Sequence, residues 1–150
     1  MADPKILGIH HIKFPVRDLE RSLAFYERVF GAERIAAADH VHGNGTRYAM
    51  ILDVPDLGTY LELRLNPAQA QRQRMFDPVT IAVEDRQALQ AWSERLDGLG
   101  IDHSPVLVAL QAWLLVFRDP DERVLRLYTL ERHGPELLPD EGSPWLAEAG

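Results

Sequence analysis

The 150-residue sequence contains no cysteine. This absence excludes disulfide bonds, thiolate zinc sites, iron–sulfur clusters and a cysteine nucleophile. It fits the reducing cytoplasm, so we expect a cytoplasmic location. Basic residues are also few: 16 Lys and Arg stand against 23 Asp and Glu, for a net charge of −7. An acidic chain is not drawn to phosphate backbones, so we expect no nucleic-acid partner.

Long apolar runs are missing as well. No stretch approaches the roughly 20 apolar residues that a membrane span needs. None follows the first seven residues, so neither a secretory signal nor a membrane partner is expected. With 46% hydrophobic residues, a chain of this length can bury a core of its own. Composition therefore favours a small globular domain.

An internal repeat divides the chain into two halves. Ile12–Asp18 aligns with Val79–Asp85 at an offset of 67 residues, and Tyr60–Leu63 aligns with Val124–Leu127 after a small shift. Alternating apolar residues predict strands, and a longer apolar stripe predicts one helix in each half. The helices are expected to follow N-caps at Asp18 and Asp85 and to end at glycines, Gly31 and Gly98. We expect strands at 9–16, 33–41, 47–52 and 59–65, and at 78–83, 103–108, 112–117 and 124–130.

The order of elements is βαβββ, twice. We therefore predict an α+β fold of two βαβββ modules, residues about 7–66 and 75–131, related by a pseudo-two-fold axis and forming a cleft. Residues 7–131 would be a single domain, with a linker around 66–74. The remaining 132–150 would be a tail, in which a short helix from Ser143 to near Ala149 is an option. For Trp145, packing and disorder both stay open.

Strand parity separates two faces in each half, because side chains alternate along a strand. One face is apolar and is expected to lie under the helix. The other is too polar for a simple core and would line the cleft. Its residues are His11, Lys13, Pro15, Tyr60, Glu62 and Arg64, then Pro78, Thr80, Ala82, Val124, Arg126 and Tyr128.

The sequence resembles the vicinal oxygen chelate superfamily, which includes glyoxalase I, bleomycin- and fosfomycin-resistance proteins and extradiol dioxygenases. The resemblance rests on His10–Ser22 with Phe25-Tyr26 and Phe30-Gly31, and on Phe117–Asp121 in the second half. It implies the glyoxalase/bleomycin resistance/dihydroxybiphenyl dioxygenase-like fold. The superfamily hosts several chemistries on one scaffold, so the resemblance is weak for the reaction.

The resemblance also implies a ligand set, which this chain keeps only in part. Metal-dependent members take ligands from the first and last strands of each half. His11 and Glu62 match two of these positions, but the other two are Pro78 and Arg126. Proline offers no side-chain ligand and arginine is a permanent cation. A divalent metal is therefore a doubtful cofactor, and no other cofactor is expected. We expect Arg126 to occupy the metal's place and pair with Glu62.

Candidate site residues follow from the same positions. His11 and Glu62 are the candidates for catalysis or metal ligation, and the structural alternative for Glu62 is an ion pair with Arg126, Arg64 or Lys13. Substrate contacts are expected from Lys13, Tyr60, Arg64, Thr80, Arg126 and Tyr128, whose polarity suits an anionic or polar small molecule. His40 and His42 lie beside the turn at Gly43–Gly45, where exposure is the stronger interpretation and a metal role the weaker.

Two functions remain open. The chain could be a lyase, isomerase or dioxygenase of the vicinal oxygen chelate type with an incomplete metal site. It could also be a metal-free protein that sequesters a drug or metabolite. A purely structural or regulatory module is a third, weaker option. A homodimer is expected, since open sheets leave edges to cover.

Overall fold

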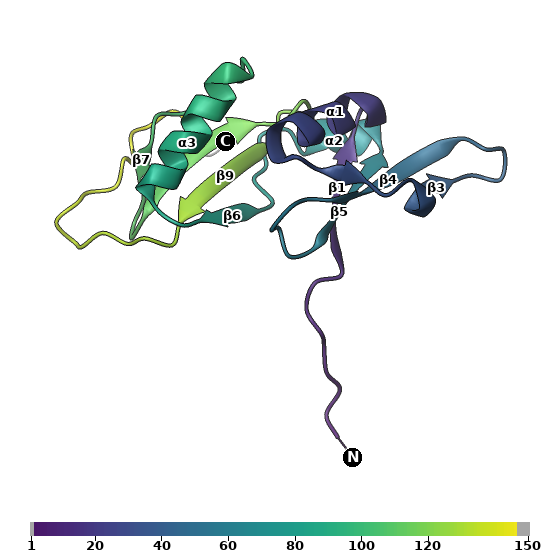
Figure 1. The fold of residues 1–150 in the computed structure, drawn as a ribbon, viewed down its shortest axis with the longest axis horizontal. Coiled ribbons are helices and arrows are strands. Elements are labelled where there is room, and N and C mark those ends of the chain that lie inside the picture. Colours follow the sequence, from purple (N-terminus) through teal and green to yellow (C-terminus); the bar gives the residue numbers. More distant parts are fainter. Residues whose placement is uncertain (1, 147–150) are drawn as a thin grey trace. The chain divides into compact units, whose positions relative to one another are not determined.

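The computed structural model describes residues 2–146. The chain divides into two compact units, Met1–Ala70 and Gln71–Gly150. Each unit contains one sheet and one principal helix (Figure 1). Among the described residues, no helix is both long and apolar enough to cross a membrane.

The first unit begins with β1 (His11–Val16) and α1 (Leu19–Phe30). The chain continues through β2 (Glu33–Arg34), a 3-10 turn at Ala36–Ala38 and β3 (His40–Val41), and then through β4 (Arg47–Asp53) and β5 (Tyr60–Leu65). The strand order is β1-β5-β4-β2, with β3 also paired to β4. β1 and β5 are parallel, whereas β4 and β5 are antiparallel.

The second unit repeats this plan. It contains β6 (Thr80–Val83), α3 (Arg86–Gly98), β7 (Leu107–Val108), β8 (Trp113–Arg118) and β9 (Val124–Thr129). The strand order β6-β9-β8-β7 matches that of the first sheet, again with a parallel first pair. The predicted α+β fold of two βαβββ modules is confirmed.

Both helices begin as the sequence predicts. The Asp18 carboxylate accepts a hydrogen bond from the Arg21 amide, and Asp85 accepts one from Ala88, which satisfies amides that the first turn leaves free. Gly31 ends α1 in the left-handed conformation, with φ of 68°. Gly98 is the last residue of α3, as predicted, but Leu99 is the C-cap and the left-handed glycine is Gly100.

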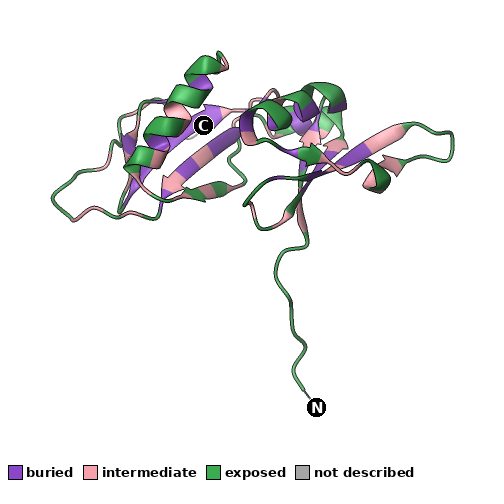
Figure 2. Ribbon diagram, viewed as in Figure 1, coloured by how far each residue is buried: buried purple, intermediate pink, exposed green. Residues whose placement is uncertain are grey.

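The apolar face of each sheet lies against its helix. In the first unit, Phe14 on β1 packs against Tyr26 on α1, with ring centroids 6.2 Å apart. In the second, Arg86 of α3 stacks over Trp113 of β8 at 4.3 Å. Buried residues gather on the strands beneath these helices, whose outward faces are exposed (Figure 2). The opposite face of each sheet is therefore left for other contacts.

Three predicted segments differ in detail. The strand expected at 33–41 is interrupted at Ala36–Ala38, where a 3-10 turn brings Asp39 back to hydrogen-bond the Arg34 guanidinium. The strand expected at 103–108 shortens to β7, and His103 makes only an isolated bridge to Phe117. The expected linker 66–74 contains the short helix α2 (Pro67–Arg72), where the Asn66 side chain accepts a hydrogen bond from the Gln69 amide.

The C-terminal segment is irregular through its described part. Trp145 packs against the second sheet, so packing and not disorder is the outcome for this residue. The option of a helix to Ala149 falls partly on residues 147–150, which lie outside the described part of the chain.

Candidate functional site

A cavity of about 500 Å³ lies on the open face of the first sheet, opposite α1. The strand register explains its lining: His11 pairs with Tyr60, and Lys13 pairs with Glu62 across β1 and β5. Directly opposed residues point to the same side of a sheet, so these side chains share one face. The lining comprises His10, His11, Lys13, Ile35, Ala38, His40, Ile51, Tyr60, Glu62 and Arg64.

Glu62 is the buried centre of this cavity, with only 1% of its surface exposed. The Arg64 guanidinium donates from Nε to Glu62 Oε2 at 2.7 Å. Burial raises the pKa of Glu62, but the hydrogen bond and charge of Arg64, together with the charges of Lys13 and His40, outweigh it and hold the pKa below its usual value. Glu62 is therefore a carboxylate at neutral pH.

Two histidines approach the other oxygen of Glu62. His11 Nε2 lies 3.6 Å from Glu62 Oε1, and His40 Nε2 lies 3.8 Å from the same atom. The opposite ring nitrogens are also engaged: His40 Nδ1 lies 3.1 Å from the Ala38 carbonyl oxygen, and His11 Nδ1 lies 2.9 Å from His10 Nδ1. Both rings are thus oriented with Nε2 toward the carboxylate.

The sequence predicts exposure of His40 beside the turn, and its side chain is 36% exposed, but it also lines the cavity. The structure puts it in the cavity because β3 pairs with β4, where His40 opposes Ala49, and Ala49 in turn opposes Arg64 on β5. The spacing of His40 and His42 places both on one face of a strand, which is the only sequence signal for a role of His40. That spacing does not reveal the register shift between His40 and Val41. His42 stacks on Tyr48 instead.

Glu62 and Arg126 each have an ion-pair partner within their own unit, and the expected pair between these two residues stays a prediction. Glu62 pairs with Arg64, one of the alternatives that the sequence left open. Arg126 Nε lies 2.8 Å from Asp77 Oδ2. Arg64 can reach Glu62 because it lies two residues along the same strand and therefore on the same face.

The other predicted contact residues fall into two groups. Lys13, Tyr60 and Arg64 line the cavity with His11 and Glu62. Thr80, Arg126 and Tyr128 share one face of the second sheet, because Thr80 opposes Arg126 and Ala82 opposes Tyr128. The structure thus brings together the five candidates of the first half within the first unit, and the three of the second half on one face within the second unit.

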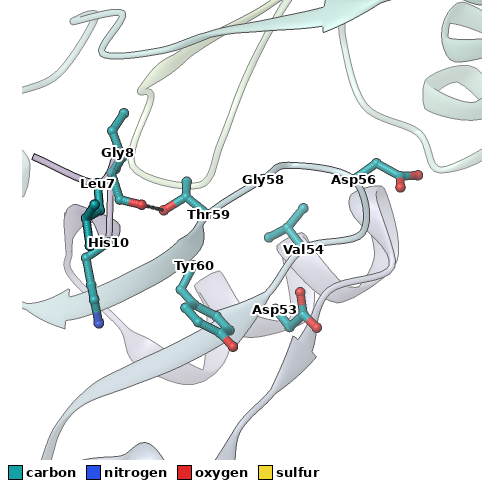
Figure 3. Close-up of a pocket in the computed structure, with 10 residues that line it drawn as sticks. Leu7, Gly8, His10, Asp53, Val54, Asp56, Gly58, Thr59 and Tyr60 are labelled. Atoms are coloured by element: carbon teal, nitrogen blue, oxygen red, sulfur yellow. Dashed lines mark hydrogen bonds between the residues drawn. The ribbon is translucent and has the colours of Figure 1, made fainter.

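A second hollow of about 530 Å³ adjoins the first, and His10 and Tyr60 line both. Figure 3 shows this hollow between the chain around Leu7 and Gly8 and the segment Asp53–Tyr60, where the Thr59 hydroxyl donates to the Ile9 carbonyl oxygen at 3.2 Å. Asp53 and Asp56 make it more acidic than the first cavity, so the two hollows suit different ligands.

The electrostatics of the first cavity favour an anion. Lys13 and Arg64 contribute two positive charges and Glu62 one negative charge, which leaves one positive charge even with neutral histidines. Within residues 2–146, no group of three or more His, Cys, Asp or Glu side chains is arranged to hold a metal ion. The Arg64 guanidinium also occupies Oε2, one of the two oxygens of the Glu62 carboxylate.

Comparisons with known proteins agree on one family for this chain. Residues 8–127 match the model of the Glyoxalase/Bleomycin resistance protein/Dioxygenase superfamily. The metallothiol transferase FosB of Shouchella clausii is 30% identical over 145 residues, covering 87% of this chain and 92% of that protein.

Two solved structures have a similar fold. One is a variant of the fosfomycin resistance protein FosX from Listeria monocytogenes in complex with Mn(II) and 1S,2S-dihydroxypropylphosphonic acid; its TM-score is 0.65 at 19% identity, over 83% of this chain and 93% of that one. The other is TnmS3, an antibiotic binding protein from Streptomyces sp. CB03234, with a TM-score of 0.64 at 19% identity, over 85% and 98% of the chains.

Proposed function

We propose a function from one premise: this chain belongs to the Glyoxalase/Bleomycin resistance protein/Dioxygenase superfamily. The function is to bind a small organic anion, such as a phosphonate, in the first-unit cavity without a metal ion. The observation that carries the proposal is the ion pair of buried Glu62 with Arg64, beside Lys13. Arg64 balances the charge of Glu62, so Lys13 leaves the cavity with a net positive charge that comes from side chains alone.

The metal named for the relatives does not fit the residues present here. His11 and Glu62 stand at two family ligand positions, but Glu62 is hydrogen-bonded to a guanidinium. The other two positions hold Pro78 and Arg126. A permanent cation near the site also raises the electrostatic cost of placing a divalent ion there. Lys13 and Arg64 are therefore the cations that we assign to the anion.

The test is binding of fosfomycin measured by isothermal titration calorimetry. Lys13→Ala should weaken binding about three- to tenfold, as expected for loss of one charged contact that is partly open to water. Lys5→Ala is the matched control, because Lys5 is the only other lysine and does not line the cavity. Equal loss in both variants, or none in either, would argue against the assignment.

A second candidate is an acid–base enzyme of the lyase or isomerase kind. Its supporting observation is that His11 Nε2 faces the ionised Glu62, an arrangement that orients an imidazole for proton transfer. Incubating the protein with fosfomycin, with or without cysteine as a thiol, and following the phosphorus by ³¹P NMR separates the two functions. A new phosphonate signal that depends on His11 would favour the enzyme; an unchanged spectrum would favour sequestration.

We also propose a cytoplasmic homodimer. Residues 2–10 extend from the first unit (Figure 1) and expose three large apolar side chains: Ile6 at 91%, Leu7 at 101% and Ile9 at 69%. The neighbouring β1 is an edge strand, and such edges need covering. Light scattering should give twice the 17.0 kDa chain mass, and Leu7→Glu should lower it. A wild-type mass near one chain at micromolar concentration would contradict the dimer.

A further inference from the structure

Tyr48 is the extra residue of a β-bulge near the start of β4. His40 of β3 opposes Ala49 of β4. The next residue of β3, Val41, opposes Arg47, so Tyr48 lies between the two pairs without a counterpart on β3. A bulge interrupts the regular alternation of side chains and re-aims the side chain of the extra residue. The position of the Tyr48 ring is therefore set by the bulge and not by strand parity.

The Tyr48 ring contacts two residues of the first-unit cavity. The Arg64 guanidinium lies over the ring, with Cζ 5.5 Å from the ring centroid. His40 meets the ring edge-on, with the two centroids 5.7 Å apart. A third neighbour, His42, stacks on the ring at 4.2 Å. Arg64 binds one oxygen of Glu62 and His40 approaches the other, so a single ring contacts a neighbour of each carboxylate oxygen.

Arg64 is thus held at two points. Glu62 Oε2 accepts the hydrogen bond from Nε at 2.7 Å, and Tyr48 supplies a ring for the guanidinium. A guanidinium has five N–H donors, of which four belong to its two terminal nitrogens. With Nε used by Glu62, these terminal nitrogens form the pair of donors that fits two oxygens of one phosphonate or carboxylate.

The contact with Tyr48 matters because Arg64 is not buried. Its side chain is 38% exposed, and an exposed arginine loses rotamer entropy when a ligand immobilises it. A ring that already holds the guanidinium reduces this cost before the ligand arrives. Tyr48 is not among the residues that line the cavity, so its effect on a ligand passes through its neighbours.

We propose that Tyr48 is a positioning residue for the first-unit cavity: its ring fixes the plane of the Arg64 guanidinium, so that both terminal nitrogens meet one oxyanion together. The ligand class is then an anion with at least two oxygens on one atom, such as a phosphonate or a carboxylate. The inference rests on the proposed function, because it takes the cavity to bind an anion. The fixing of Arg64 is a property of the free protein and is measured without a ligand.

The first test is ¹⁵N relaxation of the Arg64 Nε–Hε group in the free protein, with the signal assigned by its loss in Arg64→Lys. Tyr48→Leu removes the ring, and Tyr48→Phe is the matched control, since it keeps the ring through which Tyr48 contacts its neighbours. The order parameter should be about 0.85 in the wild type and in Tyr48→Phe, as for rigid groups, and should fall toward about 0.6 in Tyr48→Leu.

The second test is calorimetric titration of the same variants with fosfomycin. Tyr48→Leu should weaken binding about two- to fivefold, the size expected for a cation–π contact at a partly exposed site. Tyr48→Phe should bind like the wild type. The loss in Tyr48→Leu should persist in a His40→Ala background, because the ring acts through Arg64 and not through His40.

Thermal unfolding is followed in parallel, and Tyr48→Gln replaces Tyr48→Leu as the ring-free variant if the latter does not unfold cooperatively. The inference is overturned if the order parameter of Arg64 is unchanged without the ring, whatever the binding. It is also overturned if the wild type binds fosfomycin and the ring-free variant binds it equally well, or if the loss disappears in His40→Ala. A wild type that binds no fosfomycin, together with a fall in the Arg64 order parameter, would refute the proposed function and support the positioning of Arg64 by Tyr48.

Discussion

Arg64 and Glu62 form an ion pair on one face of β5, with Arg64 Nε 2.7 Å from Glu62 Oε2. The carboxylate is 1% exposed, whereas the arginine side chain is 38% exposed. Arg64 therefore acts as a partly solvated cover over a buried negative charge. Removing Arg64 alone is therefore the costly change, because it leaves the buried charge of Glu62 without its partner.

Arg64→Ala should destabilise the protein, because it leaves the Glu62 carboxylate buried without its strongest donor. The expected loss in free energy of unfolding is about 1–2 kcal/mol, the lower part of the range for an unpaired buried charge, since water reaches Arg64. Urea denaturation measures this directly. Arg74→Ala removes a cation whose pairing with Glu122 is at the surface and should change unfolding much less. Similar losses of unfolding free energy in the two variants would contradict the claim that burial of Glu62 makes its ion pair important for stability.

Glu62 should also make the free energy of unfolding depend on pH in the acid range. Its pKa is lowered in the folded state from a reference of 4.5, so the stabilisation is present above pH 4.5 and is lost as the pH falls through the lower folded value. Glu62→Gln should reduce the slope of unfolding free energy against pH below 4.5. The control is Glu20→Gln, at an exposed carboxylate paired with Arg47. An unchanged slope in Glu62→Gln would contradict this prediction and show that other titrating groups set the pH dependence of unfolding.

His133 should give the opposite dependence. Its two ring nitrogens each lie 2.7 Å from a carbonyl oxygen, of Gly134 and Ala109, and only an imidazolium donates from both. These hydrogen bonds raise the pKa of His133 above 6.5. The stabilisation is therefore complete below pH 6.5 and is lost as the pH rises through the folded value. His133→Asn should flatten the fall in melting temperature as the pH rises above 6.5, as thermal unfolding at a series of pH values would show.

Much of the fold could be predicted from periodicity alone. Alternation along β1 and β5 placed Lys13, Glu62 and Arg64 on one face, and the capping aspartates marked both helix starts. These features depend on local spacing, which the sequence displays directly.

The contacts that complete the site depend on pairings that spacing does not reveal. His40 reaches Glu62 only because a 3-10 turn and a register shift bring β3 alongside β4. Asp77, the partner of Arg126, precedes β6 in an irregular segment. The hydrogen bond from the Val108 amide of β7 to the Asp140 side chain likewise joins residues 32 positions apart, for which the sequence offers no periodic signal.

The central claim is that the first-unit cavity binds a small organic anion through Lys13 and Arg64 without a metal. The most direct test is calorimetric titration of chelator-treated protein with fosfomycin, in the presence and absence of Mn(II). The account predicts the same affinity with and without Mn(II), and loss of most of that affinity in Arg64→Ala. Binding that appears only when Mn(II) is added, and that survives Arg64→Ala, would contradict it.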